Sequence, residues 1–392
     1  MNTLSTASKT AIDFDASPCR RGGDSFKWNR YASEGDDVIA AWVADTDFLT
    51  PRPVIEAVSA RLEAGPLGYC DQPPELIEVF LQRMQRLYNW QIDPSTLVPL
   101  SGVVPGLFGA ARTASDQGDG VIAQSPNYHH FFGAAQLSDR KLLKLDNRIV
   151  SGHWQMDFEQ LEEIAAAGAK SLLLCNPHNP VGRMLTREEL ETIADICLRN
   201  ELMICSDEIH AEIILDEQKS HIPIATLSPE VADKTITLLS PSKAFNLPGI
   251  GGFAFAVIPN AELREDFIAK IHGIATQPGS LAYAAGLAAY RDCDDWLSQQ
   301  LDYLRGNRDL LQAEIASTPG LSMTHVEATF LAWIDVSELA LENPFEHFLA
   351  HSVALSDGAP MGDPNYQRLN FGCTRATLQE IIKRIRNAVA AA

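Results

Sequence analysis

Residues 171–182 read Ser-Leu-Leu-Leu-Cys-Asn-Pro-His-Asn-Pro-Val-Gly, an apolar run that passes directly into a turn. Runs of the same kind lie at 121–124, 202–206, 235–239 and 253–257. They are apolar throughout instead of alternating with polar residues, which is typical of parallel strands buried on both faces of a sheet. These runs therefore predict that the middle of the chain forms a buried, mostly parallel sheet.

Capping residues mark helices between these runs. Asp157 stands three residues before Gln160, and Thr186 stands three residues before Glu189, which is the spacing of a helix N-terminus. The alternation of strands and helices predicts an α/β fold, in which helices cover both faces of the central sheet as a three-layer large domain.

The last third of the chain has a different pattern. Helical patterns and then strand-like pieces follow in the order 261–272, 280–290, 294–315, 329–334 and 367–371. A closing helix, with Thr377 and Glu380 as its expected caps, has its apolar residues on one face. We interpret this part as a smaller α+β domain. We expect it to comprise residues 1–49 and 286–392, and the large domain to comprise residues 50–285.

Composition excludes several classes of function. The 392 residues include 31 Lys+Arg and 51 Asp+Glu, which gives a formal net charge of −20. This surplus argues against nucleic-acid phosphates and anionic membranes as partners, although a local basic pocket can still bind a small anion. The longest apolar stretches, 249–258 and 281–289, are far shorter than the roughly 20 residues that span a bilayer.

Cysteine usage indicates a reducing environment. The chain has seven cysteines, an odd number, and no Cys-x-x-Cys pair. Cys175 and Cys205 lie inside apolar runs, where we expect buried thiols. The N-terminus has no apolar signal region. Together these features predict a cytoplasmic protein that binds no membrane.

Four polar loops follow buried strands or open helices, and they lie at 101–106, 176–182, 206–210 and 240–246. In open α/β sheets, ligands bind in the crevice beyond the carboxyl ends of the strands, so these loops are the candidate site. Taken singly, each has an ordinary structural explanation, such as a turn, a cap or a solvated charge.

Taken together, the loops contain what pyridoxal 5′-phosphate (PLP) chemistry requires. Lys243 supplies an amine that can bond the aldehyde carbon of the cofactor. Asp207 supplies a carboxylate that keeps the pyridine nitrogen protonated. Tyr128 supplies a flat partner for the ring.

The same loops contain candidate ligands for the phosphate. They are the hydroxyls of Ser240 and Ser242 and the backbone N–H groups of Val103 and Val104, where a helix is expected to begin.

A metal site is the competing interpretation of one loop. Glu208, His210 and Glu212 would share one side if the strand before them continued, and carboxylates and imidazoles bind metals. No recognised ligand spacing supports this alternative, and the prediction is that no metal binds.

The sequence resembles the fold type I PLP enzymes, the aspartate aminotransferase superfamily, and within them the MalY/PatB-type cystathionine β-lyases. The resemblance covers about residue 14 to the C-terminus and implies a PLP-transferase-like large domain. It is carried by the segments 21–28, 42–48, 68–69, 102–105, 175–183, 206–210, 241–246, 327–333 and 368–372.

The resemblance implies further roles for individual residues. Asn179 and His210 would bond the phenolic oxygen of the cofactor. Arg368 would pair with the substrate α-carboxylate, with Asn179, Trp42 and Ala44 also on the substrate side. Tyr69 would reach the phosphate in a neighbouring subunit, which implies a homodimer with shared sites.

Three positions depart from the family pattern. Thr46 stands where these lyases usually have Met, and Ala244 where they have Thr. Gly251 stands where many aminotransferases have a phosphate-binding Arg.

These features predict a PLP-dependent β-lyase that cleaves cystathionine or a related cysteine S-conjugate to a thiol, pyruvate and ammonia. An aminotransferase that uses the same residues is the alternative. A PLP-containing regulatory protein and a metal-dependent enzyme are the more distant ones.

Overall fold

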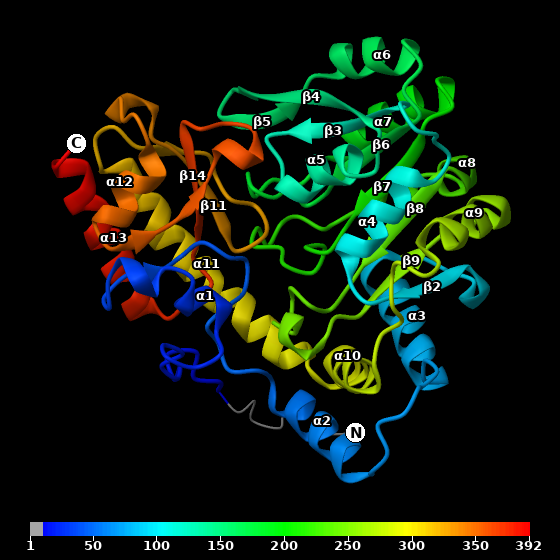
Figure 1. The fold of residues 1–392 in the computed structure, drawn as a ribbon, viewed down its shortest axis with the longest axis horizontal. Helices are drawn as coiled ribbons and strands as arrows, with labels where there is room; N and C mark the ends of the chain where they lie inside the picture. The colour runs from blue at the N-terminus through cyan, green and yellow to red at the C-terminus, as the bar shows by residue number, and fades with distance from the viewer. Residues whose placement is uncertain (1–10) are drawn as a thin grey trace, which may run out of the picture.

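The computed structural model describes residues 11–392, so the first ten residues of the expected 1–49 segment lie outside the described part of the chain. An eight-stranded sheet with the order β2-β9-β8-β7-β6-β3-β4-β5 forms its centre (Figure 1). The strands are β2 (Leu97–Leu100), β3 (Gly120–Ser125), β4 (Lys141–Val150), β5 (His153–Met156), β6 (Ser171–Cys175), β7 (Met203–Asp207), β8 (Thr235–Leu239) and β9 (Ala254–Val257).

The predicted parallel arrangement is confirmed for the centre of the sheet and wrong for one strand. β8, β7, β6, β3 and β4 run parallel to one another. β9, expected to be parallel, pairs antiparallel with both β8 and β2. The chain between β8 and β9 contains only the short 3-10 turn Pro248–Ile250 and no crossover helix, so β9 returns in the opposite direction. Its side chains are all buried, which explains why its apolar pattern resembled that of a parallel strand.

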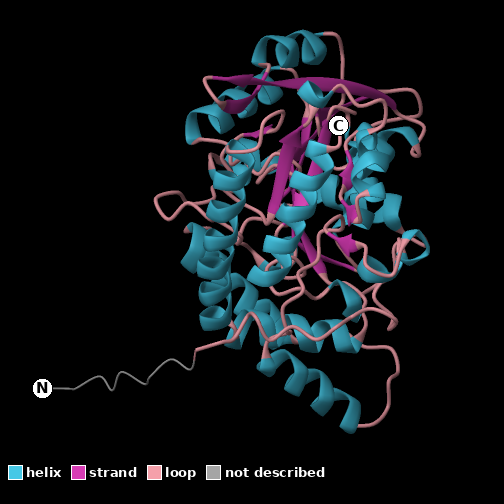
Figure 2. Ribbon diagram, turned by 90° about the vertical axis from the view of Figure 1, so that its left-hand side faces the viewer, coloured by secondary structure: helices cyan, strands magenta, loops and turns pink. Residues whose placement is uncertain are grey.

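Helices cover both faces of this sheet, as Figure 2 shows, and this confirms the predicted three-layer α/β fold. Val121 and Ala123 of β3 pack towards one layer of helices, while Ile122 between them packs towards the other. The first layer contains α4 (Val103–Arg112), α5 (His129–Gln136) and α9 (Ala261–Ile271). The second contains α6 (Phe158–Ala166), α7 (Arg187–Arg199) and α8 (Pro229–Asp233).

Towards β9, the second face is covered by another group of helices. Phe80 packs on Phe255, with ring centroids 4.7 Å apart, and Tyr283 packs on Phe253. The elements concerned are α3 (Pro74–Tyr88) and α10 (Ser280–Asp292), with α2 (Arg52–Glu63) packed against α10.

A smaller antiparallel sheet is built from the C-terminal third and has the order β10-β11-β14-β13. Its strands are β10 (Ser322–Met323), β11 (Leu331–Asp335), β14 (Tyr366–Asn370) and β13 (Ser356–Asp357). It lies beside α11 (Asp294–Ala316), α12 (Pro344–Ala350) and α13 (Arg375–Ala390) (Figure 1). The predicted α+β part is therefore present.

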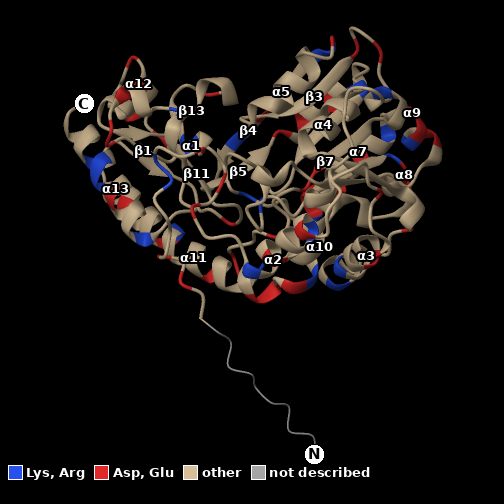
Figure 3. Ribbon diagram, turned by 60° about the horizontal axis from the view of Figure 1, so that its bottom comes forward, with Lys and Arg blue, Asp and Glu red and all other residues tan. Residues whose placement is uncertain are grey.

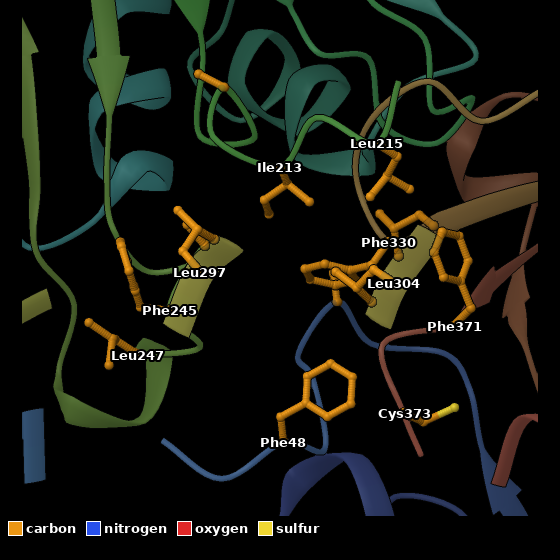
Figure 4. Close-up of a cluster of buried hydrophobic side chains, with 14 of the residues drawn as sticks. Phe48, Ile213, Leu215, Phe245, Leu247, Leu297, Leu304, Phe330, Phe371 and Cys373 are labelled. Atoms are coloured by element: carbon orange, nitrogen blue, oxygen red, sulfur yellow. The ribbon is translucent and has the colours of Figure 1, made fainter. Parts of the chain in front are cut away.

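The N-terminal segment is joined to this C-terminal part. β1 (Ile39–Ala40) pairs in parallel with β12 (Val353–Ala354), and α1 (Phe26–Asn29) precedes β1. Segments distant in sequence also share one apolar core. Figure 4 shows Phe48, Phe245, Phe330 and Phe371 together in it.

No helix in the part of the chain that the structure describes is long and apolar enough to cross a membrane.

Two of the three predicted helix caps are confirmed. The Asp157 side chain accepts a hydrogen bond from the Gln160 N–H, and Thr186 and Glu189 form a capping box. The expected caps of the last helix were wrong. α13 begins three residues earlier, where Thr374 caps it by accepting from the Thr377 N–H at 3.1 Å. A Thr-x-x-Thr spacing gave no capping-box signal, whereas Thr377 and Glu380 imitated one.

Substitution of the true cap should destabilise the protein more than substitution of the residue it caps. We expect Thr374→Ala to lower the free energy of unfolding by about 1 kcal/mol, since it leaves a helix N–H without its acceptor. Thr377→Ala, which keeps the cap, is the matched control. Urea unfolding followed by circular dichroism measures both. Equal losses in the two variants would contradict the assignment of Thr374.

Candidate active site

The polar loops meet at one edge of the large sheet, beyond the carboxyl ends of β6, β7 and β8. Cys175 and Asp207 are register partners, as are Asp207 and Leu238, so these strands end side by side. The Asn176 N–H also donates to the Asp207 carbonyl at 3.1 Å. The loop that carries Lys243 follows β8 at the same edge.

Lys243 lies among charged groups that come from three parts of the chain. Its Nζ donates to the Ala44 carbonyl at 2.7 Å. Burial and the positive charge of Arg368 lower the pKa of Lys243 to about 8, against the opposing effect of Asp45 and Asp207. A lysine with this pKa is largely neutral in mildly alkaline solution and is therefore a nucleophile and a base.

Asp207 has the features expected of a partner for a cationic ring. Burial raises its pKa to about 7, while the Ile209 N–H, which donates to Oδ1 at 3.1 Å, and Lys243 act in the opposite direction. A buried carboxyl in this state is stabilised as a carboxylate by an added positive partner. A protonated pyridine nitrogen is such a partner.

His210 is a buried imidazole with one nitrogen lacking a partner. Its Nδ1 makes no hydrogen bond within the described residues. Burial, followed by repulsion from Lys243 and Arg368, lowers its pKa to about 3, so the ring is neutral. A neutral imidazole in the tautomer with hydrogen on Nδ1 donates one hydrogen bond there, which fits an oxygen of a ligand.

Two loops approach each other closely where the cofactor phosphate is expected. Gly102 caps α4, whose first N–H groups belong to Val103 and Val104. Gly252 has φ +76°, and a Cβ there would stand 2.1 Å from the Ser101 carbonyl oxygen. Only glycine permits this approach. Gly252 is a site residue that the sequence analysis missed, although the Gly251-Gly252 pair was its signal.

The backbone also explains one departure from the family pattern. Gly251 has φ +100°, a left-handed conformation that an Arg would adopt only with strain. Ser240 is engaged within the loop, because its hydroxyl donates to the Phe253 carbonyl at 2.6 Å. Of the two serines, Ser242 is therefore the better hydroxyl donor for a phosphate.

Arg368 forms the opposite side of the site. It is 4% exposed, and no carboxylate forms an ion pair with it within residues 11–392. Its guanidinium donates to the side chain of Asn179 at 3.0 Å and to the Trp42 carbonyl at 2.9 Å. Its Nε has no hydrogen-bond partner in the described structure, and burial lowers its pKa to about 10. A buried cation with an unused donor is suited to an incoming carboxylate.

Tyr128 is half-buried beside these groups, and its backbone N–H donates to the Asn179 carbonyl at 3.2 Å. Burial raises the pKa of its hydroxyl, and the nearby Arg368 opposes this shift. Tyr69 is different. Its side chain is fully exposed in the loop after α2, so the structure does not bring it into the site of its own chain.

The structure does not bring together the three residues of the alternative metal site. β7 ends at Asp207, so the residues after it do not share one side of a strand. Glu208 is bonded to Ser206 and lies 2.7 Å from His221, while Glu212 forms an ion pair with Arg83. Within residues 11–392, no group of three or more His, Cys, Asp or Glu side chains is arranged to hold a metal ion.

Two amides near the site were also missed by the sequence analysis. Asn246 pairs with the backbone of Thr46, and Asn370 donates to the carbonyls of Val43 and Asp45. Both lie in segments that had been singled out, but no sequence pattern reports such distant side-chain-to-backbone contacts.

The residues present fit PLP. Lys243 offers the amine, Asp207 the buried carboxyl, His210 the unpartnered nitrogen, and the cradle formed by the start of α4 beside Gly252 the N–H groups for a phosphate.

Comparison with known proteins gives a consistent result. The profile of the family described as aminotransferase class I and II matches residues 37–385. The cystathionine beta-lyase PatB of Bacillus subtilis (strain 168) is 32% identical, over 96% of this chain and 100% of its own length. Protein MalY of Escherichia coli (strain K12) is 30% identical, over 97% of this chain and 99% of its own length.

Solved structures agree over nearly the whole chain. The crystal structure of OvoB superposes with a TM-score of 0.94 at 40% identity, covering 97% of this chain and 100% of its own. The crystal structure of cystalysin from Treponema denticola, which contains PLP, superposes with a TM-score of 0.93 at 30% identity and the same coverage.

The lowered pKa of Lys243 should be visible in its reaction with an aldehyde. We expect the rate of PLP addition to the cofactor-free protein to rise with pH and level off above a midpoint near 8, because the neutral amine is the nucleophile. Arg368→Met should raise the midpoint, since it removes a positive charge, and Asp45→Asn should lower it. Stopped-flow absorbance measures the rates. A midpoint at the ordinary lysine value of about 10.4 would contradict this environment.

Proposed function

We propose that this chain, which belongs to the aminotransferase class I and II family, is a PLP-dependent carbon–sulfur β-lyase. In this proposal its substrate is L-cystathionine or a related cysteine S-conjugate. Relatives named cystathionine beta-lyase in Bacillus subtilis and Corynebacterium glutamicum, 32% and 29% identical, support the choice of reaction. The observation that carries it is the Lys243 amine set between a buried carboxyl, Asp207, and a buried guanidinium without an anionic partner, Arg368.

When bound, PLP supplies an aldehyde carbon that bonds the substrate amine and a conjugated ring that accepts electrons from Cα. Arg368 binds the substrate carboxylate through two N–H groups, which fixes the orientation of Cα. The Lys243 amine in its neutral form, which the lowered pKa favours, then removes the Cα proton. The Cβ–S bond breaks, the thiolate leaves with the bonding electrons, and hydrolysis of the remaining fragment gives pyruvate and ammonia.

The other site residues position the cofactor in this proposal. Asp207 would keep the ring nitrogen protonated, and Tyr128 would supply a flat partner for the ring. His210 donates from its unpartnered nitrogen to the phenolic oxygen. The amide oxygen of Asn179 accepts a hydrogen bond from Arg368, so its NH₂ group is left to donate to the phenolic oxygen of the cofactor. The phosphate is held by Ser242, with Ser240 behind it, and by the N–H groups of Val103 and Val104.

An aminotransferase reaction remains the second candidate, because the same residues would serve it. The aspartate aminotransferase of Bacillus subtilis is 26% identical over 91% of this chain. The products separate the two: a lyase releases thiol and pyruvate without an acceptor, whereas a transferase depends on a keto acid.

We also propose a homodimer with shared active sites. Exposed apolar side chains lie together in α2 and in the loop after it, at Ile55, Leu62, Leu67 and Tyr69. Burying this surface against a second copy would remove apolar area from water and bring Tyr69 to the partner's phosphate cradle.

The division into residues 1–49 with 286–392, and 50–285, is likewise a proposal, supported by the pairing of β1 with β12. We propose a cytoplasmic location, supported by seven cysteines that are all free thiols.

Removal of the amine should abolish the reaction. We expect Lys243→Ala to release pyruvate from cystathionine at least about 10³-fold more slowly than the parent protein, since both the covalent anchor and the base are lost. A lactate dehydrogenase-coupled assay without added keto acid measures it. Wild-type turnover in this variant, or a parent protein that turns over only with a keto acid, would refute the lyase assignment.

The proposed dimer predicts an effect of an exposed residue on cofactor affinity. Tyr69→Phe should raise the Kd for PLP by about tenfold, which corresponds to one lost hydrogen bond to a charged group. Leu137→Ala, at another exposed apolar residue, is the matched control. Equilibrium dialysis measures Kd, and light scattering the mass. A monomeric protein, or an unchanged Kd, would contradict the shared site.

A further inference from the structure

A short segment without regular structure, residues 42–46, lies between the two cations of the site. It is called the 42–46 segment below. It belongs to neither a helix nor a strand, so its backbone receives no ladder hydrogen bonds. Buried backbone oxygens still need donors, and here side chains supply them. The position of the segment therefore depends on those side chains.

Each carbonyl of the segment accepts a hydrogen bond from a side chain. Two of the donors are the proposed catalytic and substrate-binding groups: Lys243 donates to Ala44 at 2.7 Å, and Arg368 donates to Trp42 at 2.9 Å. The remaining side-chain donors to these carbonyls are Ser356 on Trp42, Asn370 on Val43 and Asp45, Asn246 on Thr46, and Lys27 on Asp45.

Lys27 is the buried charged group of this set that the proposed reaction does not use. It is 1% exposed, and its Nζ lies 3.0 Å from Asp47 Oδ2 and 3.5 Å from Asp45 Oδ1. The same ammonium donates to the Asp45 carbonyl at 3.3 Å. Burial disfavours its charge, but Asp47 and Asp45 outweigh burial and raise the pKa of Lys27, so it stays protonated.

The residues around Lys27 hold the segment from both ends. The Trp42 indole donates to the Lys27 backbone carbonyl at 3.0 Å, and the Trp28 indole donates to Asp47 Oδ1 at 2.9 Å. The Asp47 N–H donates to the Gly372 carbonyl, two residues beyond β14. α1 thus fixes a backbone that carries the Ala44 and Trp42 carbonyls.

We propose that Lys27, through its buried ion pair with Asp47, is a positioning residue that holds the 42–46 segment against Lys243 and Arg368. The inference rests on the proposed function, because its consequence is the correct placement of the base and of the carboxylate-binding guanidinium. When Arg368 and Lys243 turn to substrate and cofactor, the segment loses two donors. Lys27, Asn246 and Asn370 then keep it in place.

Lys27 also acts on Lys243 electrostatically, through Asp45. The groups facing Lys243 are Arg368 from β14, Asp207 and His210 from the end of β7, and Asp45 from the segment. Two carboxyls favour the charged form of Lys243, and Asp45 has the larger effect of the two. Lys27 and Arg20, at 3.5 and 3.3 Å, offset the Asp45 charge. Loss of Lys27 leaves this charge less compensated.

The test compares three variants of the full chain. Lys27→Met removes the ammonium with little change in volume, and Lys27→Met with Asp47→Asn removes both charges of the pair. Arg308→Met is the matched control, because Arg308 forms a largely buried ion pair with the half-buried Asp216 at 2.8 Å and its hydrogen bonds go to no residue of the segment. Thermal unfolding, KM and kcat with cystathionine, and the pH midpoint for PLP addition are measured for each.

We expect Lys27→Met to raise KM about tenfold and to lower kcat/KM roughly 10²-fold, the size of effect that a misplacement near 1 Å produces. Its midpoint for PLP addition should move to higher pH. The double variant should regain most of the thermal stability lost by Lys27→Met, because no unpaired buried carboxylate remains, yet keep the raised KM. Arg308→Met should lose stability and keep KM and the midpoint.

Two results would overturn the proposal. One is a double variant that recovers the parent KM as well as the stability, which would mean that the Lys27–Asp47 pair has only a structural role. The other is a Lys27→Met protein whose KM and midpoint match those of Arg308→Met. If Lys27→Met does not fold, Asp47→Asn alone, which keeps an oxygen acceptor for Trp28, is compared in its place. A parent protein without lyase activity would refute the proposed function, while the shifted midpoint would still report on Lys27.

Discussion

The burial of Arg368 without a carboxylate partner in the described structure is the constraint on which the site depends. A buried guanidinium is costly unless its N–H groups are bonded. Here neutral oxygens of Asn179, Trp42 and Ser356 accept from it, and Nε is left without a partner. Had a glutamate filled this place, the pair would be neutral and unable to bind an anion. The neutral oxygens satisfy the N–H groups of Arg368 without neutralising its positive charge, which stays available to attract an anionic ligand.

The same reasoning reconciles an anion-binding site with a chain of net charge −20. In Figure 3, acidic and basic positions alternate along the ribbons of the outer helices, whereas Arg368 of the site is buried. Interactions between exposed charges are largely screened beyond about 8 Å at physiological salt. An anion in the site would be bound at hydrogen-bond distance, away from bulk water, by Arg368, by the start of the helix at Val103 and by the loop that carries Lys243. Local geometry therefore outweighs the global field.

The sequence predicted the features that local patterns encode. Continuous apolar runs gave the buried strands, and turns after them gave Asp207 and the loop of Lys243. It could not predict the direction of β9, because burial on both faces produces the same pattern in either direction. It mistook Thr377 for a cap, because a capping-box spacing was present without the cap. The contacts of Asn370 with residues 43 and 45 span more than 300 positions and leave no periodic signal.

The irregular backbone at residues 42–46 follows from what it must bond. In a strand, these carbonyls would accept hydrogen bonds from a neighbouring strand, and in a helix they would accept them from N–H groups of the helix itself. Here they face outward to side chains from both sheets, Lys243 after β8 and Arg368 on β14. A charged carboxylate forms stronger hydrogen bonds with a guanidinium than a carbonyl does, so in the proposed function a substrate carboxylate would displace the Trp42 oxygen from Arg368 favourably. The carbonyls of the segment thus occupy positions that ligand oxygens would take, and they connect residues of the two sheets. Contacts that a ligand replaces cannot hold the segment in place, so we assign that role to the buried pair of Lys27 and Asp47.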